Sequence, residues 1–176
     1  MNIEEIIVEA IRNATSDVFT TMLGAQLGPG EVSIESSMPD ANDGVVSFIG
    51  VAGPWAGTGS LACSPSMACR ICSQMLLSES QAVNEEVLDA IAELTNMIVG
   101  NAKTELERHV GPLGLSLPTV VFGRNFKARS AGHNRWILVK FDWEGELLLV
   151  RLCLTPNERG VHPLPHANAT AYALEV

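Results

Sequence analysis

Five residues that suit a contact surface recur at steps of three and four in the stretch from about residue 84 to residue 110. At about 100° per residue, as in an α-helix, they fall on one side of the helix axis. Carboxylates attract cations, and a carboxamide both donates and accepts hydrogen bonds without adding charge. Such a face fits a partner that contributes its own cations. This row, called the polar ridge below, consists of Glu86, Asp89, Glu93, Asn96 and Gly100.

The pattern of the polar ridge leaves two readings open. It is either the solvated back of an amphipathic helix or a contact surface. Three features count against a merely solvated back. Gly100 costs a helix interior about 1 kcal/mol relative to alanine, Met97 lies near the centre of the same face, and like charges three or four residues apart repel one another. As a contact surface, the helix would bind a partner through Glu86, Asp89, Met97 and Gly100.

Other residue patterns with known chemistry are weak in this chain. Cys69 and Cys72 have the spacing of half a zinc site or a redox pair, but no second such pair occurs and no histidine lies at ligand spacing. The four cysteines are therefore expected to be reduced, buried thiols, and we predict neither a metal site nor a bound cofactor. The glycine-rich stretch 57–59 lacks the following helix of a phosphate-binding loop and predicts a strand or turn.

Three stretches have the hydrophobic period of amphipathic helices. They cover residues 3–23, a segment from Pro65 to about residue 77, and about 84–110. The third predicted helix has an apolar side directly opposite the polar ridge, and this side is expected to face the core. Its members are Val87, Leu88, Ile91, Thr95, Ile98, Ala102 and Leu106.

The remaining segments have the patterns of strands and of a hairpin. Single strands are predicted at 32–36, 45–51, 57–63 and 117–123. Residues 135–154 predict a hairpin that turns at Glu144-Gly145, because a two-residue loop there makes one face uniformly apolar. The expected cross-strand pairs are Phe141 with Leu148, Val139 with Val150, and Ile137 with Leu152.

Together these elements predict an α+β fold, with long helices packed on antiparallel sheets. One domain is expected over residues 1–156. Residues 157–176 are rich in proline and alanine without a clear period, and they are predicted to form a C-terminal tail or extension.

The overall charge and hydropathy exclude several partners. The 176 residues include 11 Lys and Arg against 20 Asp and Glu, giving a net charge of −9. This balance argues against nucleic acid, because phosphate contacts need clustered cations. No apolar run approaches the roughly 18 residues of a membrane span, and the first residues lack a signal-peptide pattern. We therefore expect a cytoplasmic protein without a membrane partner.

One local cluster of basic residues contrasts with the acidic net charge of the chain. Five bases and no acid lie between Arg124 and Lys140. They form either an anion-binding face or a set of solvated strand and loop positions, and the second reading is favoured.

The polar ridge resembles the signature helix of the CheC/CheX/FliY phosphatases. In that family an acidic residue or serine is followed by Glu-x-x-Asn, and a proline comes just over twenty residues later. Asp89, Glu93 and Asn96 match this pattern, and Pro118 matches the proline at an interval one residue shorter. Residues 17–23 also resemble the first helix of CheX proteins. CheC-type members usually carry two Glu-x-x-Asn motifs, whereas this chain carries one, so the resemblance favours the CheX type.

The resemblance implies a CheC/CheX-like fold and a phosphatase that hydrolyses the aspartyl phosphate of a phosphorylated CheY-like response regulator. Asn96 would orient the attacking water, because its carboxamide interacts with the water and the phosphoryl group without the repulsion of a carboxylate. Glu93 would pair with the regulator's lysine, and Asp89 would play a supporting role. Gly100 would let the partner's backbone approach closely. The regulator would bring the Mg²⁺, and the family's joining of sheets at their edges implies a homodimer.

Two alternatives remain at the level of the sequence. The chain is a non-catalytic CheX-like module that binds a response regulator or a flagellar switch component, or it is an unrelated domain with a fortuitous motif. A structure that buries Asn96 would support the unrelated domain.

Overall fold

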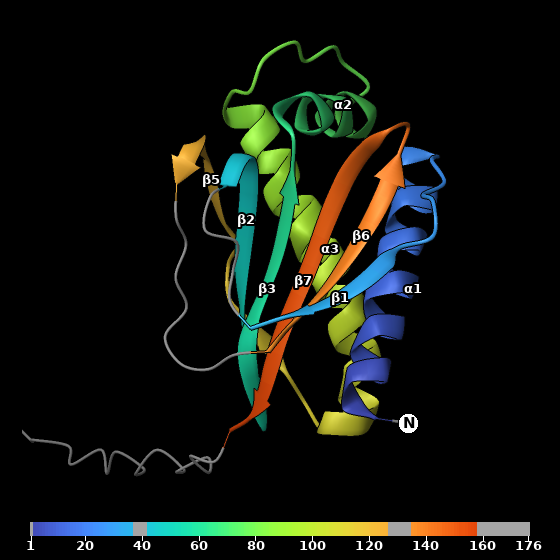
Figure 1. Ribbon diagram of the computed structural model, residues 1–176. Coiled ribbons are helices and arrows are strands. Elements are labelled where there is room, and N and C mark those ends of the chain that lie inside the picture. The colour runs from blue at the N-terminus through green and yellow to red at the C-terminus, as the bar shows by residue number, and fades with distance from the viewer. Residues whose placement is uncertain (1, 37–41, 127–134, 158–176) are drawn as a thin grey trace, which may run out of the picture.

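Helices cover one face of a seven-stranded antiparallel sheet in the computed structural model, which describes residues 2–36, 42–126 and 135–157 (Figure 1). The helices are α1 (Ile3–Leu23), α2 (Pro65–Leu76) and α3 (Glu85–Val110). The strands are β1 (Glu31–Glu35), β2 (Asn42–Ala52), β3 (Trp55–Cys63), β4 (Gly114–Leu115), β5 (Thr119–Phe126), β6 (Trp136–Trp143) and β7 (Glu146–Pro156). The predicted α+β class is confirmed.

The three predicted helices are confirmed, with end signals that the sequence already contains. The side chain of Ser64 accepts a hydrogen bond from the Met67 amide and caps α2, and Pro65 occupies its first turn. Gly24 ends α1 with a left-handed backbone at φ 60°. Glycine adopts this conformation without the steric cost of a side chain.

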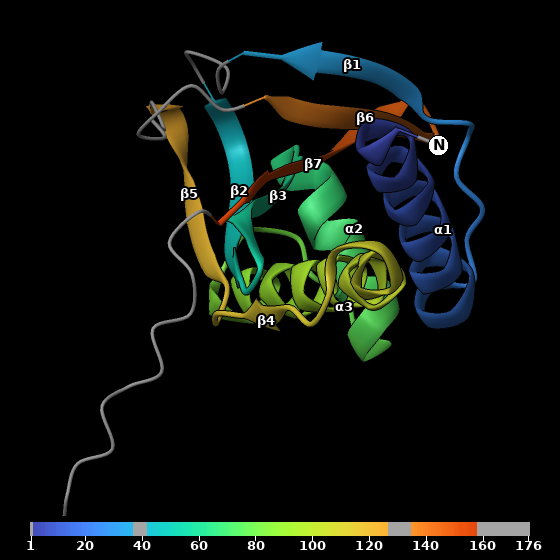
Figure 2. The same ribbon diagram turned by 90° about the horizontal axis from the view of Figure 1, so that it is seen from below.

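The sheet has the order β1-β6-β7-β3-β2-β4, with β5 also paired to β2. The β6–β7 hairpin has the predicted register, including Phe141 opposite Leu148 and Val139 opposite Val150. Seen from below, the sheet curves around the helices, with β1 and β6 towards α1 and β5 at the other side (Figure 2). Among the described strands, β1 pairs only with β6 and forms one edge of the sheet.

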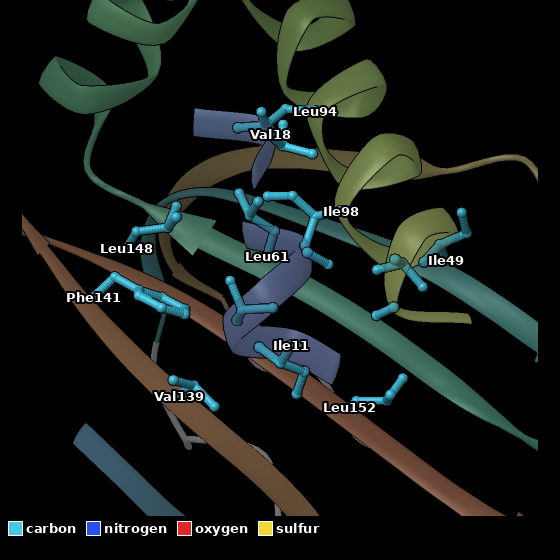
Figure 3. Packing of buried hydrophobic residues seen from close by; sticks show 14 of the residues in the cluster. Ile11, Val18, Ile49, Leu61, Leu94, Ile98, Val139, Phe141, Leu148 and Leu152 are labelled. Carbon is cyan, nitrogen blue, oxygen red and sulfur yellow. The ribbon is translucent and has the colours of Figure 1, made fainter. Parts of the chain in front are cut away.

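The core lies between the helices and the concave face of the sheet. Leu94 and Ile98 of α3 point towards the same interior as Leu61 of β3 and Ile11 of α1 (Figure 3). Stretch 57–59 lies within β3, as a strand, and its Gly59 has a packing role. A Cβ added there would come within 2.9 Å of the Val99 side chain, so this glycine lets α3 approach the sheet closely.

One sequence prediction needs correction. The strand predicted at 117–123 is instead β5, which starts at Thr119, and the separate short strand β4 precedes it. The favoured reading of the basic stretch, solvated strand and loop positions, agrees with exposed Arg124 on β5 and with exposed Arg135 before β6, which forms an ion pair with Glu4 at 3.1 Å. Lys127, Arg129 and residues 158–176, the bulk of the predicted tail, lie outside the described residues.

The cysteine prediction holds for all four residues. Cys63, Cys69, Cys72 and Cys153 are free and buried. Within the described part of the chain, no group of three or more His, Cys, Asp or Glu residues is placed to hold a metal ion.

Candidate active site

Helix α3, which carries the polar ridge, is stabilised at both ends. The side chain of Asn84 accepts a hydrogen bond from the Val87 amide at 3.0 Å and caps the first turn. Glu85 and Glu86 lie in this first turn, and Arg108 and His109 lie in the last. These charges complement the helix dipole, so Glu86 also has a structural role in the helix.

The predicted core side of α3 faces the sheet and the other two helices. Val87, Ile91, Thr95 and Ile98 are at most 1% exposed. Thr95 is the polar member of this side, and its hydroxyl donates to the Ile91 carbonyl at 2.7 Å, which satisfies it within the helix. Because this side is buried, the opposite side of α3 must face outward.

The acidic residues and the asparagine of the polar ridge are exposed to solvent. Within the described part of the chain, the side chains of Glu86, Asp89, Glu93 and Asn96 make no hydrogen bond or ion pair. Residues three apart on a helix have Cβ atoms about 5–6 Å from each other, so Glu93 and Asn96 can enter one cleft of a partner together. The exposure of Asn96 counts against the unrelated domain in which this residue would be buried.

Gly100 and Met97 occupy different environments from the charged members. Met97 is half-buried and packs against the core cluster, so its place on the polar face does not leave it free. Gly100 is also half-buried, yet a Cβ added there would meet only Leu115 Cδ1, at 3.9 Å. The chain's own packing therefore does not require glycine at this position.

The segment after α3 flanks the polar ridge, and the sequence reasoning missed this. β4 lies alongside α3 (Figure 2). Glu107 holds the two together, because its Oε1 atom accepts from the Leu113 amide and from Lys103 Nζ, both at 2.8 Å. The Lys103 hydrogen bond, followed by that of Leu113, keeps the pKa of Glu107 below its usual value. The alternation of leucine at 113, 115 and 117 was a signal for this extended segment.

The polar ridge is an exposed surface and not the wall of the pocket beside α2. That pocket, of about 660 Å³, lies beside α2 and the α2–α3 connection, and Glu93 and Asn96 are not among its lining residues. None of the helices in the described part of the chain is both long and apolar enough to cross a membrane. Chemically, the ridge offers unpaired carboxylates and a carboxamide to a group that another molecule brings.

Solved structures with the same fold place the chain in the CheC-like class. A CheC-like superfamily protein from Shewanella sp. PV-4 is 26% identical, with a TM-score of 0.76 over 88% of this chain and 99% of that one. Chemotaxis protein CheX from Vibrio vulnificus is 26% identical, with a TM-score of 0.75 over 85% of this chain and 99% of that one. The CheX–CheY–BeF3–Mg²⁺ complex from Borrelia burgdorferi matches at 21% identity with a TM-score of 0.69 over 84% of this chain and 96% of that one, which shows the fold alone.

The family follows from two further matches. The family described as chemotaxis phosphatase CheX matches residues 45–142. CheY-P phosphatase CheX from Thermotoga maritima is 31% identical over 128 residues, which make up 72% of this chain and 81% of that protein. The chain belongs to the CheX family of chemotaxis phosphatases, and the predicted resemblance is confirmed.

Proposed function

We propose that this protein hydrolyses the aspartyl phosphate of a phosphorylated CheY-type response regulator. The observation that carries the proposal is the exposure of Glu93 and Asn96, without partners in the described chain, on a helix fixed at both ends. Membership of the CheX family supports it, as does the name of the 31% identical relative, a CheY-P phosphatase. The CheX of Borrelia burgdorferi, solved in complex with CheY, shares the fold.

In the proposed reaction a water oxygen attacks phosphorus and the bond from phosphorus to the aspartyl oxygen breaks. The aspartate leaves as a carboxylate, and inorganic phosphate takes up the protons of the water. Phosphoryl transfer of this kind depends mainly on positioning and on charge stabilisation. Asn96 would orient the water, since a carboxamide accepts and donates hydrogen bonds without repelling the phosphoryl oxygens.

Glu93 would set the position of the helix on the regulator by pairing with its lysine. The Mg²⁺ would belong to the regulator as part of the substrate, and no cofactor would be bound by this chain. Asp89 and Glu86 would add to the attraction of a cationic rim on the partner, at a range that ordinary salt concentrations limit to about 8–10 Å. The reaction would take place in the cytoplasm, where such regulators are phosphorylated.

The test compares Asn96→Ala with Asn101→Ala, a matched control because Asn101 is also an exposed asparagine of α3. The substrate is a CheY from the same genome, phosphorylated with acetyl phosphate in the presence of Mg²⁺. We expect Asn96→Ala to lower the accelerated dephosphorylation rate by about 100-fold or more, and Asn101→Ala to leave it unchanged. Both variants should keep their thermal unfolding midpoint, because exposed substitutions typically change stability by less than about 0.5 kcal/mol.

Retention of full acceleration by Asn96→Ala would refute the role of this residue. Stoichiometric binding by the unsubstituted protein without any shortening of the phosphoryl lifetime would instead support the non-catalytic binding module.

We further propose that two copies of the chain associate through β1. This strand ends the sheet, and its helix-facing residues Val32 and Ile34 are 37% and 49% exposed and line a pocket of about 370 Å³ between β1 and α1. An edge strand with unpaired backbone groups and uncovered apolar side chains is suited to pair with another strand.

A further inference from the structure

We propose that Leu117 is an anchor residue that docks the phosphorylated regulator beside the polar ridge. This inference rests on the proposed function, because the occupant of the surface is the same receiver domain that Asn96 would serve. Leu117 is 89% exposed, and burial of such a side chain against a partner is favourable. An exposed leucine alone is ordinary, so its position and its backbone carry the argument.

The first step is the path of the chain after α3. The Leu113 amide contacts Glu107, and Leu115 Cδ1 lies 3.9 Å from the Cβ position of Gly100, so the segment runs back towards the start of the helix. An extended chain advances about 3.3 Å per residue and a helix about 1.5 Å. Two further residues therefore bring Leu117 about four helix positions beyond Gly100, which is the level of Asn96.

The second step is the face on which Leu117 lies. Leu115 pairs with Val51, and the Ser116 amide donates to the Gly50 carbonyl, whereas Thr119 already pairs with Phe48. Two residues, Leu117 and Pro118, therefore stand opposite the single residue Ile49, as in a β-bulge.

Ile49 is 1% exposed and belongs to the core on the helix side of the sheet. The bulged residues opposite Ile49 are therefore on the side of the sheet that α3 covers. Bulges of this kind re-aim side chains, often beside functional sites.

The third step is the rigidity of the position. The Gly50 amide donates to Ser116 Oγ at 2.8 Å, and this hydroxyl donates to the Leu117 carbonyl at 2.9 Å. The following Pro118 restricts Leu117 to an extended backbone. The backbone of Leu117 is thus fixed before binding, and little conformational entropy is lost when its side chain is covered.

The choice of occupant follows from the neighbours of Leu117. Along this flank, exposure rises from Leu113, which is 7% exposed, through half-buried Leu115 to Leu117. The apolar strip therefore reaches the surface beside the part of the ridge that would enter the regulator's site. A receiver domain seated on Asn96 would cover Leu117 as well, and the apolar contact would supply affinity while the ridge supplies chemistry.

The experiment measures KM and kcat for CheY from the same genome, phosphorylated with acetyl phosphate, with three variants. Leu117→Ala should raise KM about tenfold, equivalent to about 1.4 kcal/mol, while kcat stays within about twofold of the unsubstituted protein. Leu117→Met should keep the KM of the unsubstituted protein, because methionine keeps the apolar volume. Leu147→Ala is the control, since Leu147 is a 53% exposed leucine on the opposite face of the sheet, and it should leave both parameters unchanged.

Three outcomes would overturn the inference. An unchanged KM in Leu117→Ala, in a protein whose Asn96→Ala variant is inactive, would refute the docking role and leave the proposed function standing. A change in oligomeric state on light scattering in Leu117→Ala would assign the residue to contact between copies of this chain. Absence of both acceleration and binding by the unsubstituted protein would refute the proposed function and this inference together.

Discussion

At the scale of the residue, substitution of Gly100 distinguishes a structural role of this position from a role in binding a partner. Alanine at this position is compatible with the surroundings, since its Cβ would meet only Leu115 Cδ1, at 3.9 Å. Gly100→Ala should therefore raise the free energy of unfolding by about 0.5–1 kcal/mol, the usual helix preference for alanine. If the regulator's backbone approaches this position, the same variant should raise KM by about fivefold, or about 1 kcal/mol.

Urea unfolding and steady-state dephosphorylation measure the two effects of Gly100→Ala separately. A gain in stability with an unchanged KM would show that the partner does not approach Gly100. A loss of stability would contradict the open packing around this glycine.

Cys63 should be unreactive in the folded protein. Its burial, followed by the nearby Glu146 and Cys69, raises the pKa of this thiol to about 12. At pH 8 iodoacetamide should label Cys63 only through unfolding, as read by mass spectrometry, whereas protein in urea should be labelled readily. Since the unfolded thiol ionises near 9.0, its stabilising effect is present below that pH and is lost as the pH rises from about 9 towards 12. Labelling of Cys63 faster than global unfolding would refute this.

Individual residues of the ridge were predictable because exposure on a helix follows directly from its period. Glu93 and Asn96 lie opposite the predicted core side, of which only Leu88 is partly exposed. Met97 was less predictable. The helix projection assigns it to the polar face, but it packs against the core cluster, because a side chain on that face is buried or free according to what lies beside the helix.

At the scale of the element, Glu107 fixes the segment that carries Leu115 and Leu117. The Lys103 and Leu113 hydrogen bonds lower the pKa of Glu107. The hydrogen bond from the Leu113 amide to the Glu107 carboxylate is therefore fully present above the ordinary carboxyl pKa, 4.5, and is lost as the pH falls through the lowered pKa of the folded state. The Leu113 amide resonance should titrate with a midpoint below 4.5 in an NMR experiment. Lys103→Met should move this midpoint upward, because it removes the largest cause of the shift.

A midpoint at or above 4.5 in the unsubstituted protein would contradict the connection between Glu107 and Leu113. Glu107→Gln should make the titration disappear, which assigns the effect to this carboxyl group.

Elements with a clear period were predicted well, and the missed element has a physical reason. The three helices and the β6–β7 hairpin follow from local patterns, and the hairpin register is fixed by its two-residue turn. β4 has only two residues, Gly114 and Leu115, and it exists because β2 offers them an edge. A pairing that depends on a partner more than sixty residues away in the sequence leaves almost no local signal.

At the scale of the whole molecule, the fold places the polar ridge of α3 and the sheet edge at β1 on different parts of the surface. The helices lie on one face of the sheet (Figure 1). The acidic residues and the asparagine of the ridge lie on the exposed side of α3, and in the strand order β1 is at the opposite end of the sheet from β2, β4 and β5. The strand order was not predictable, because β1 joins β6 from about a hundred residues further along the chain. As a consequence of this order, two copies joined at β1 would leave both ridges uncovered, and each copy would bind a regulator independently.

Ile34→Lys tests the proposed association. Ile34 is 49% exposed on the helix side of β1, and a lysine that points into a sheet-edge contact opposes pairing. Light scattering at micromolar concentration should show a dimer for the unsubstituted protein and a monomer for Ile34→Lys. Phe122→Lys is the control, since Phe122 is 50% exposed on β5 at the other side of the sheet, and it should remain a dimer. Dissociation by Phe122→Lys alone would place the contact at β5, and a monomeric unsubstituted protein would refute the association.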